Sequence, residues 1–131
     1  MKWIISLFLL TAIARAGTPE AMSLLKANCF SCHNPNKKKG GLDLTTRKAT
    51  LLGSEDGKVL LPGKASASRL IQVLRPAADP HMPPKDQLSP RAIGALEKWV
   101  SAGAKWNALL LKDRARPMHD NLATLPKGYA P

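Results

Sequence analysis

"CFSCH", residues 29–33, holds both cysteines of a chain of 131 residues. The cysteines are three positions apart and the histidine follows at once, so on a helical turn Cys29, Cys32 and His33 project from one face. Four kinds of site can use such a turn: half of a zinc site, a redox dithiol, a disulfide loop, or an anchor for haem. The surrounding sequence has to decide among them.

Three of these interpretations find little support in the rest of the chain. A structural zinc site takes four protein ligands, usually in two pairs, and only His81 and His119 remain to complete one. A redox dithiol of the thioredoxin type needs a βαβ context, which is missing. A disulfide across so small a loop removes little unfolded-state entropy, and it leaves His33 without a role.

The haem interpretation gives all three side chains a task. Two thiols add to the two vinyl groups of a porphyrin, an imidazole reaches the iron, and C-x-x-C-H is the signature of this attachment. We therefore expect one covalent haem c, with Cys29 and Cys32 as its anchors and His33 as a ligand of its iron. The zinc, dithiol and disulfide interpretations stay as alternatives.

Residues 1–16 have the pattern of a signal peptide. Lys2 gives a short positive region, an apolar run follows, and "ARA" at 14–16 is a small-x-small cleavage pattern. The run is too short for a bilayer-spanning helix, which needs roughly 20 residues. We expect cleavage after Ala16 and export to the periplasm or an equivalent compartment, where haem attachment takes place; an uncleaved anchor is the alternative.

The chain is strongly basic. From Gly17 onward it carries 18 Lys and Arg against nine Asp and Glu, a net charge of +9. Such a charge suits nucleic acid, an anionic membrane or an acidic protein. An exported protein rarely serves nucleic acid, so we expect an acidic redox protein as partner, with a membrane surface as the alternative. Lys37, Lys38 and Lys39 directly follow the motif and are candidates to steer that partner.

The sequence pattern predicts an all-α fold of short helices and long loops. Helices are expected over 18–33 with Thr18 as cap, briefly after Thr45 or Thr46, after a cap at Ser66 or Ser68, and over 89–104. The helix over 89–104 has the clearest signals, with Ser at the cap, Pro first and Gly at the end. Strand signals are nearly absent, and a chain with eleven prolines and nine glycines needs a buried cofactor to complete its core.

A haem iron has a second axial position, for which the sequence offers several ligands. The candidates are Met22, Met82, Met118, His81 and His119. Met82 is the best placed, because the two prolines that follow it in "HMPP" stiffen the backbone and hold the sulfur at low entropic cost. His81 is the alternative, and ligation by two histidines would lower the reduction potential.

Other side chains are candidates for the surroundings of the haem. Arg47, Arg69 and Arg75 are possible propionate partners by charge alone. Trp99 and Trp106 can pack on the haem or in the core. The apolar side chains expected to cover the haem are Leu42, Leu44, Leu60, Leu61, Leu70, Leu74, Ile93, Leu96 and Trp99.

The sequence resembles the single-haem c-type cytochromes, and more narrowly the planctomycete-type cytochrome c domains. The similar stretches are "CFSCHNPNKKKGGLDLTTR", "LLPGKASASRLIQVL", "HMPP" and "LSPRAIGALEKWVSAGAKW", which together cover roughly residues 19–106. One departure is visible, since a loop that often reads Gly-Gly in this family reads Gly53-Ser54 here. The signal-peptide pattern and the extent of the resemblance together divide the chain into a signal peptide (1–16), a cytochrome c domain (17–106) and an extension of unknown role (107–131).

The resemblance implies a cytochrome-c-like fold whose last helix crosses the first, with "GGLDL" near a haem edge. It implies thioether links at Cys29 and Cys32, His33 as proximal ligand and Met82 as distal ligand. The implied activity is transfer of single electrons between redox partners, with no catalysis. Two alternatives remain: a haem-bearing subunit that docks onto a larger dehydrogenase through 107–131, and a ligand-binding or peroxidase-like protein, which needs an open iron site.

Overall fold

The computed structural model describes residues 17–112. In this part of the chain the regular elements are helices, and the one β-type pairing is an isolated bridge between Ser54 and Gly57. The elements in order are α1 (Thr18–Asn28), the 3-10 turn η1 (Lys39–Gly41), α2 (Arg47–Leu52), α3 (Arg69–Gln72), α4 (Pro90–Ser101) and the 3-10 turn η2 (Ala108–Leu110). The predicted all-α class is confirmed. No helix in the described range is long and apolar enough to cross a membrane.

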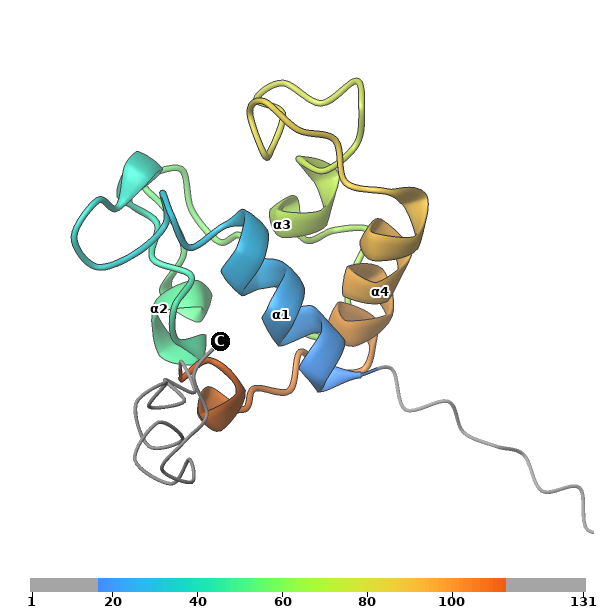
Figure 1. The fold of residues 1–131 in the computed structure, drawn as a ribbon. Coiled ribbons are helices and arrows are strands. Elements are labelled where there is room, and N and C mark those ends of the chain that lie inside the picture. The colour runs from blue at the N-terminus through green and yellow to red at the C-terminus, as the bar shows by residue number, and fades with distance from the viewer. Residues whose placement is uncertain (1–16, 113–131) are drawn as a thin grey trace, which may run out of the picture.

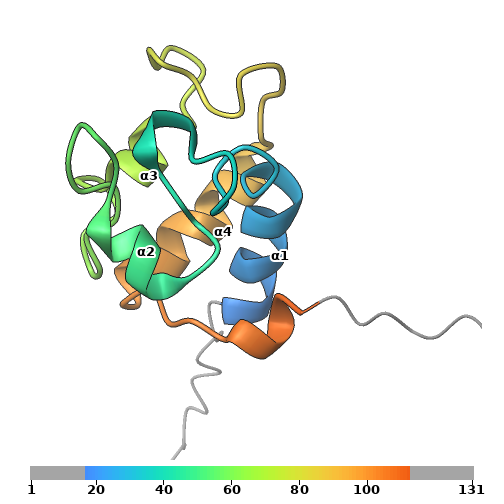
Figure 2. The ribbon, with the colours of Figure 1, turned by 90° about the vertical axis from the view of Figure 1, so that its left-hand side faces the viewer.

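The core forms where α1 packs against α4, the two longest helices (Figures 1 and 2). Met22 and Leu25 of α1 and Leu96, Trp99 and Val100 of α4 are almost completely buried. Their spacing of three and four residues places them on one face of each helix. The first and last helices thus pack together at an angle, as the sequence resemblance implies.

Helix α4 begins and ends where its sequence predicts. The Ser89 hydroxyl accepts a hydrogen bond from the Ala92 N–H at 3.1 Å, and Pro90 is the first helical residue. Gly103, just past the helix, has φ +103°, a conformation that costs glycine little and other residues more.

Two predicted caps differ from the structure. Gly17, not Thr18, is the N-cap of α1, and Thr18 is already helical, so its hydroxyl caps nothing. Ser68 does stand at the N-cap of α3, but its hydroxyl makes no cap bond. It accepts from the Leu61 N–H at 2.8 Å and donates to the Lys64 carbonyl at 2.9 Å, so this buried serine organises the preceding loop.

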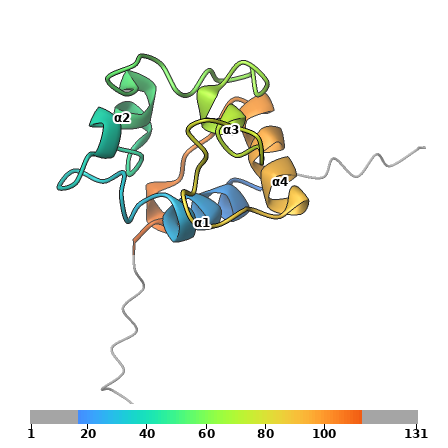
Figure 3. The same cartoon turned by 90° about the horizontal axis from the view of Figure 1, so that it is seen from above.

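Helix α2 is held to the end of α4 by one side chain. Thr46 caps α2 by accepting from the Ala49 N–H at 3.1 Å, as predicted. The Arg47 guanidinium donates to the carbonyls of Ala104 at 3.2 Å and Gly103 at 3.4 Å. Seen from above, α2 and α4 lie on opposite sides of the molecule, and this long-range contact joins them (Figure 3).

The residues that follow the predicted domain boundary still pack on the helices. Turn η2 contacts α1, and the Lys26 ammonium donates to the Leu111 carbonyl at 3.3 Å. Leu109 and Leu110 of this turn point outward, with 71% and 40% of their surfaces exposed. The signal-peptide pattern over 1–16, and Met118 and His119, lie outside the described residues.

Candidate haem-binding site

The C-x-x-C-H motif forms a turn that continues the direction of α1. Helix α1 ends at Asn28, and the Cys29 N–H still donates to the Leu25 carbonyl at 2.9 Å. Four residues on, the His33 N–H donates to the Cys29 carbonyl at 3.0 Å, which is a helical spacing. The predicted helical turn therefore exists, although regular helix stops before it.

The imidazole of His33 is oriented by a backbone carbonyl. Its Nδ1 lies 3.0 Å from the Lys39 oxygen. A carbonyl can only accept, so Nδ1 carries the proton and Nε2 keeps its lone pair free. A second-shell hydrogen bond of this kind fixes the tautomer and direction of a metal-binding histidine.

The segment after the motif folds back over it. The Asn34 side chain donates to the Phe30 carbonyl at 2.7 Å and accepts from the backbone of Asn36 and Lys37, which turns the chain sharply. Two backbone bonds then close the loop: the Lys39 N–H donates to Cys32, at 3.2 Å, and the Leu44 N–H donates to His33, at 3.0 Å. The "GGLDL" stretch is thereby held beside the motif.

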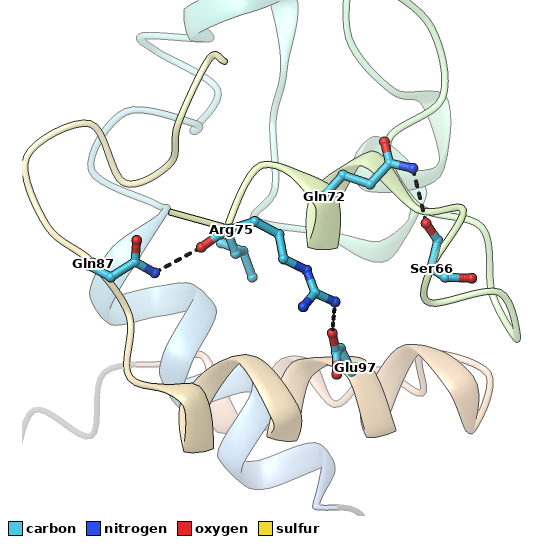
Figure 4. Close-up of polar contacts among 6 residues, drawn as sticks. Ser66, Gln72, Arg75, Gln87 and Glu97 are labelled. Atoms are coloured by element: carbon cyan, nitrogen blue, oxygen red, sulfur yellow. Dashed lines mark hydrogen bonds and ion pairs between the residues drawn. The ribbon is translucent and has the colours of Figure 1, made fainter. Parts of the chain in front are cut away.

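A second group of segments carries Met82. The Met82 N–H donates to the Val73 carbonyl, just after α3, at 2.8 Å. Farther along the same loop, the Gln87 amide donates to the Leu74 carbonyl at 2.9 Å (Figure 4). These two anchors hold the long loop between α3 and α4 against α3.

One cavity brings the motif and the methionine loop together. Cys29, Cys32, His33 and Met82 all line it. Apolar side chains make most of the remaining wall: Leu42, Leu44, Val59, Leu70, Val73, Leu74, Pro80, Pro83 and Pro84. The predicted anchors and both predicted iron ligands thus share one cavity.

The competing iron ligands point elsewhere. His81 does not line the cavity, and its Nε2 lies 2.7 Å from Oε1 of Gln87. Met22 is completely buried in the face of α1 that packs on α4. In the described part of the chain, Met82 is the methionine that reaches the cavity.

The three arginines considered as propionate partners have different surroundings in the structure. Arg69 lines the cavity. Arg47 is committed to the carbonyls of Gly103 and Ala104, and Arg75 pairs with Glu97 of α4 at 2.5 Å (Figure 4). The sequence could not separate them, because the partners of Arg47 and Arg75 lie far along the chain.

The expected apolar cover is partly wrong. Leu42, Leu44, Leu70 and Leu74 line the cavity as predicted. Five others do not: Leu60, Leu61, Ile93, Leu96 and Trp99. Those on α4 are used in its packing against neighbouring helices. Val59 and Val73 line the cavity instead, and no sequence signal distinguished them from other core valines.

Neither candidate tryptophan lines the cavity. Trp99 is buried, its indole N–H donates to the Lys105 carbonyl at 2.7 Å, and its ring lies 5.8 Å from that of Trp106 in a tilted pair. Both therefore pack in the protein core, which was the alternative to packing on the haem.

The donor set fits a haem c. Cys29 and Cys32 are both free thiols, as addition to two vinyl groups requires. Burial raises the pKa of the Cys29 thiol from 9.0 to about 11, so this sulfur lies in an apolar setting. An imidazole with a free Nε2, a thioether and an apolar wall complete the set.

Comparison with known proteins matches part of the chain to a family. Residues 29–86 match the family model described as Planctomycete cytochrome C. No curated protein and no solved structure matches the chain. The matched segment begins at Cys29 and ends four residues after Met82, so it contains the complete set of cavity donors described above.

The family match sets the general chemistry of the domain. A cytochrome c domain carries haem c and transfers electrons, which indicates an electron-transfer protein rather than an enzyme. Domains of this type are typically exported. Over residues 29–86, the chain is thus similar to the Planctomycete cytochrome C family.

Proposed function

We propose that this protein is an exported, single-haem cytochrome c that carries one electron at a time between redox proteins. Cys29 and Cys32 would hold the haem through thioethers, and His33 and Met82 would bind its iron. The haem supplies the reversible one-electron change of the iron. The chain supplies attachment, ligand direction and exclusion of water.

The observation that carries this proposal is the shared cavity. His33 and Met82 are 49 positions apart in the sequence, yet both line the same apolar space with the two thiols. Independent backbone contacts hold them there, through the Lys39 carbonyl for His33 and the Val73 carbonyl for Met82. Two ligands held in place by the backbone would stay on the iron in both redox states, so little would have to rearrange during transfer.

The wall around the iron tunes its potential. A thioether ligand stabilises Fe(II) relative to a second imidazole, and apolar side chains lower the local dielectric. Both effects favour the less charged ferrous site and predict a reduction potential at the high end for a haem. A closed ligand set also disfavours peroxidase chemistry or gas binding, which need an open iron position.

Export and partner choice rest on the sequence. The signal-peptide pattern over 1–16 supports delivery to the periplasm, with cleavage after Ala16. The net charge of +9 from Gly17 onward supports a redox partner with an acidic surface.

The ligand set is tested by making the same Met→Leu substitution at two positions, one in the cavity and one in the core. Met82→Leu keeps the side-chain volume but removes the sulfur, so the reduced protein should bind CO and the potential should fall. Met22→Leu makes the same change in the α1–α4 core and should leave both properties unchanged. A Met82→Leu protein with the wild-type spectrum, potential and resistance to CO would show that Met82 is not the ligand.

A docking role for the C-terminal segment is a second proposal. The exposed leucines of η2, Leu109 and Leu110, favour contact between a haem-bearing subunit and a larger dehydrogenase. Replacing both by serine should abolish co-purification of such an enzyme while haem binding is retained. Unchanged co-purification contradicts this role.

A further inference from the structure

The haem cavity has four charged or hydroxyl-bearing residues in its lining besides the predicted haem-binding residues. Lys39, Ser54, Asp56 and Arg69 line it and are here called the polar rim. Three chain segments make this rim, and backbone bonds join them: the Glu55 N–H donates to Gly40 at 3.0 Å, and the Leu70 N–H donates to Val59 at 2.8 Å. The segments that carry the polar rim are therefore tied to one another by the backbone.

The rest of the cavity wall offers little to a charged group. Apart from the four haem-binding residues and Gly40, the remaining lining is apolar except for Asn28. The Asn28 amide already donates to the Leu24 carbonyl at 2.8 Å. A carboxylate placed against this wall would lose its hydration without gaining a partner, which is strongly unfavourable.

Haem c carries two carboxylates, its propionates. They are the groups of the ligand that must meet charge or water, so they belong at the polar rim. A guanidinium is the best partner for a carboxylate, because two parallel N–H donors match its two oxygens.

Arg69 is the arginine of the described chain that lines the cavity. Arg47 donates to two carbonyls near the end of α4, and Arg75 pairs with Glu97. Arg69 is the first residue of α3, and its side chain is exposed at the rim, where a propionate can meet it without complete loss of water.

We propose that Arg69 pairs with a haem propionate and positions the porphyrin, with Lys39 as a second cation on the same rim. This inference rests on the proposed function and assigns a residue for which the family match gives no role. The fixed positive charge of Arg69 also favours Fe(II), because the reduced site carries one positive charge fewer. The negative charge of Asp56, on the same rim, favours Fe(III) instead.

The test measures reduction potential against pH in four holoprotein variants. Arg69→Gln should lower the potential near pH 7, and Arg69→Lys should restore most of the loss. Asp56→Asn should raise the potential. Arg75→Gln removes the same charge as Arg69→Gln but outside the cavity, and should have the smallest effect.

The pH profile separates a propionate partner from a merely structural residue. Loss of the guanidinium raises the propionate pKa, so the rise in potential on acidification should begin at higher pH in Arg69→Gln than in wild type or Arg75→Gln. Equal profiles and equal potentials in Arg69→Gln and Arg75→Gln overturn the assignment. If Arg69→Gln does not accumulate, Arg69→Lys takes its place. An ammonium lacks the paired N–H donors of a guanidinium, so a small displacement of the rise to higher pH in Arg69→Lys supports the pairing, and a profile equal to that of Arg75→Gln overturns it.

Failure of this inference differs from failure of the proposed function. If wild type carries no covalent haem, the function itself is wrong and no potential can be measured. If wild type carries haem with His and Met ligation but the Arg69 variants behave like the Arg75 variant, only the role of Arg69 is wrong.

Discussion

At the scale of single residues, the site depends on side chains whose surroundings limit what they can do. The hydrogen bond to the Lys39 carbonyl fixes the orientation of the His33 imidazole, because the carbonyl requires a proton on Nδ1. The Cys29 thiol is kept neutral, since burial raises its pKa to about 11. A neutral, buried thiol binds a metal ion poorly unless the ion can displace the proton of the thiol.

The Cys29 pKa predicts slow alkylation of the haem-free protein. In a Cys32→Ser variant, Cys29 is the sole thiol. At pH 8 a thiol of pKa 11 is about 0.1% thiolate, whereas an ordinary cysteine is roughly a quarter thiolate. The iodoacetamide rate should therefore be roughly two-hundredfold below that of the same protein in urea, and should keep rising about tenfold per pH unit until pH 11. A rate that levels off near pH 9 in the folded protein contradicts the burial of this thiol.

At the scale of elements, glycines have different roles in helix and loop. Gly94 lies inside α4, and a β-carbon added there meets nothing within 4 Å. Gly53 ends α2 with φ +90°, and a β-carbon there would collide with the Gly57 carbonyl oxygen. The loop over 53–57 reaches both the polar rim and η1, so its shape matters to the site.

The environments of Gly94 and Gly53 predict that alanine changes the free energy of unfolding in opposite directions at the two positions. Gly94→Ala should raise the free energy of unfolding by roughly 0.5–1 kcal/mol, because alanine is the better helix former and space is available. Gly53→Ala should lower it by about 1 kcal/mol or more, through both the positive φ and the collision. Urea denaturation of the holoproteins measures both changes. A change of the same sign in both variants would show that at least one of the two environments is not as described.

Some elements could be predicted from the sequence, and others could not. Helix α4 was predictable because Ser89, Pro90 and Gly103 are local signals. The roles of Arg47 and Arg75 were not, because their partners are set by tertiary contacts. The motif predicted three donors through their spacing, and "HMPP" predicted Met82 through its prolines. The polar rim had no such signal, because it is assembled from three separate segments.

At the scale of the whole molecule, the cofactor cavity and the protein core are continuous. The cavity leucines Leu42, Leu44, Leu70 and Leu74 are also members of the buried core. A small chain rich in loops buries little apolar surface by itself, so the haem adds to the core as well as to function. Removing the haem should therefore weaken the fold as well as abolish electron transfer.

The basic charge predicts how the protein reacts with small redox reagents. Oxidation by ferricyanide, an anion, should slow as salt rises, because salt screens attraction over about 10 Å at 0.1 M. Replacing Lys37, Lys38 and Lys39 by glutamine should flatten this dependence. The matched change of Lys64, Lys98 and Lys105, none of which lines the cavity, should flatten it less. Equal salt dependence in both triple variants contradicts a steering role for residues 37–39.

The most direct test of the central claim is the intact mass of the mature protein, recorded with its visible spectrum. We predict the mass of residues 17–131 plus one haem, retained after denaturation, and a low-spin spectrum with the long-wavelength ferric band of thioether-to-iron ligation. The Cys29→Ser, Cys32→Ser double variant should lose the added mass. A mature protein without covalent haem, or a high-spin ferric spectrum that shows an open iron site, would contradict the account.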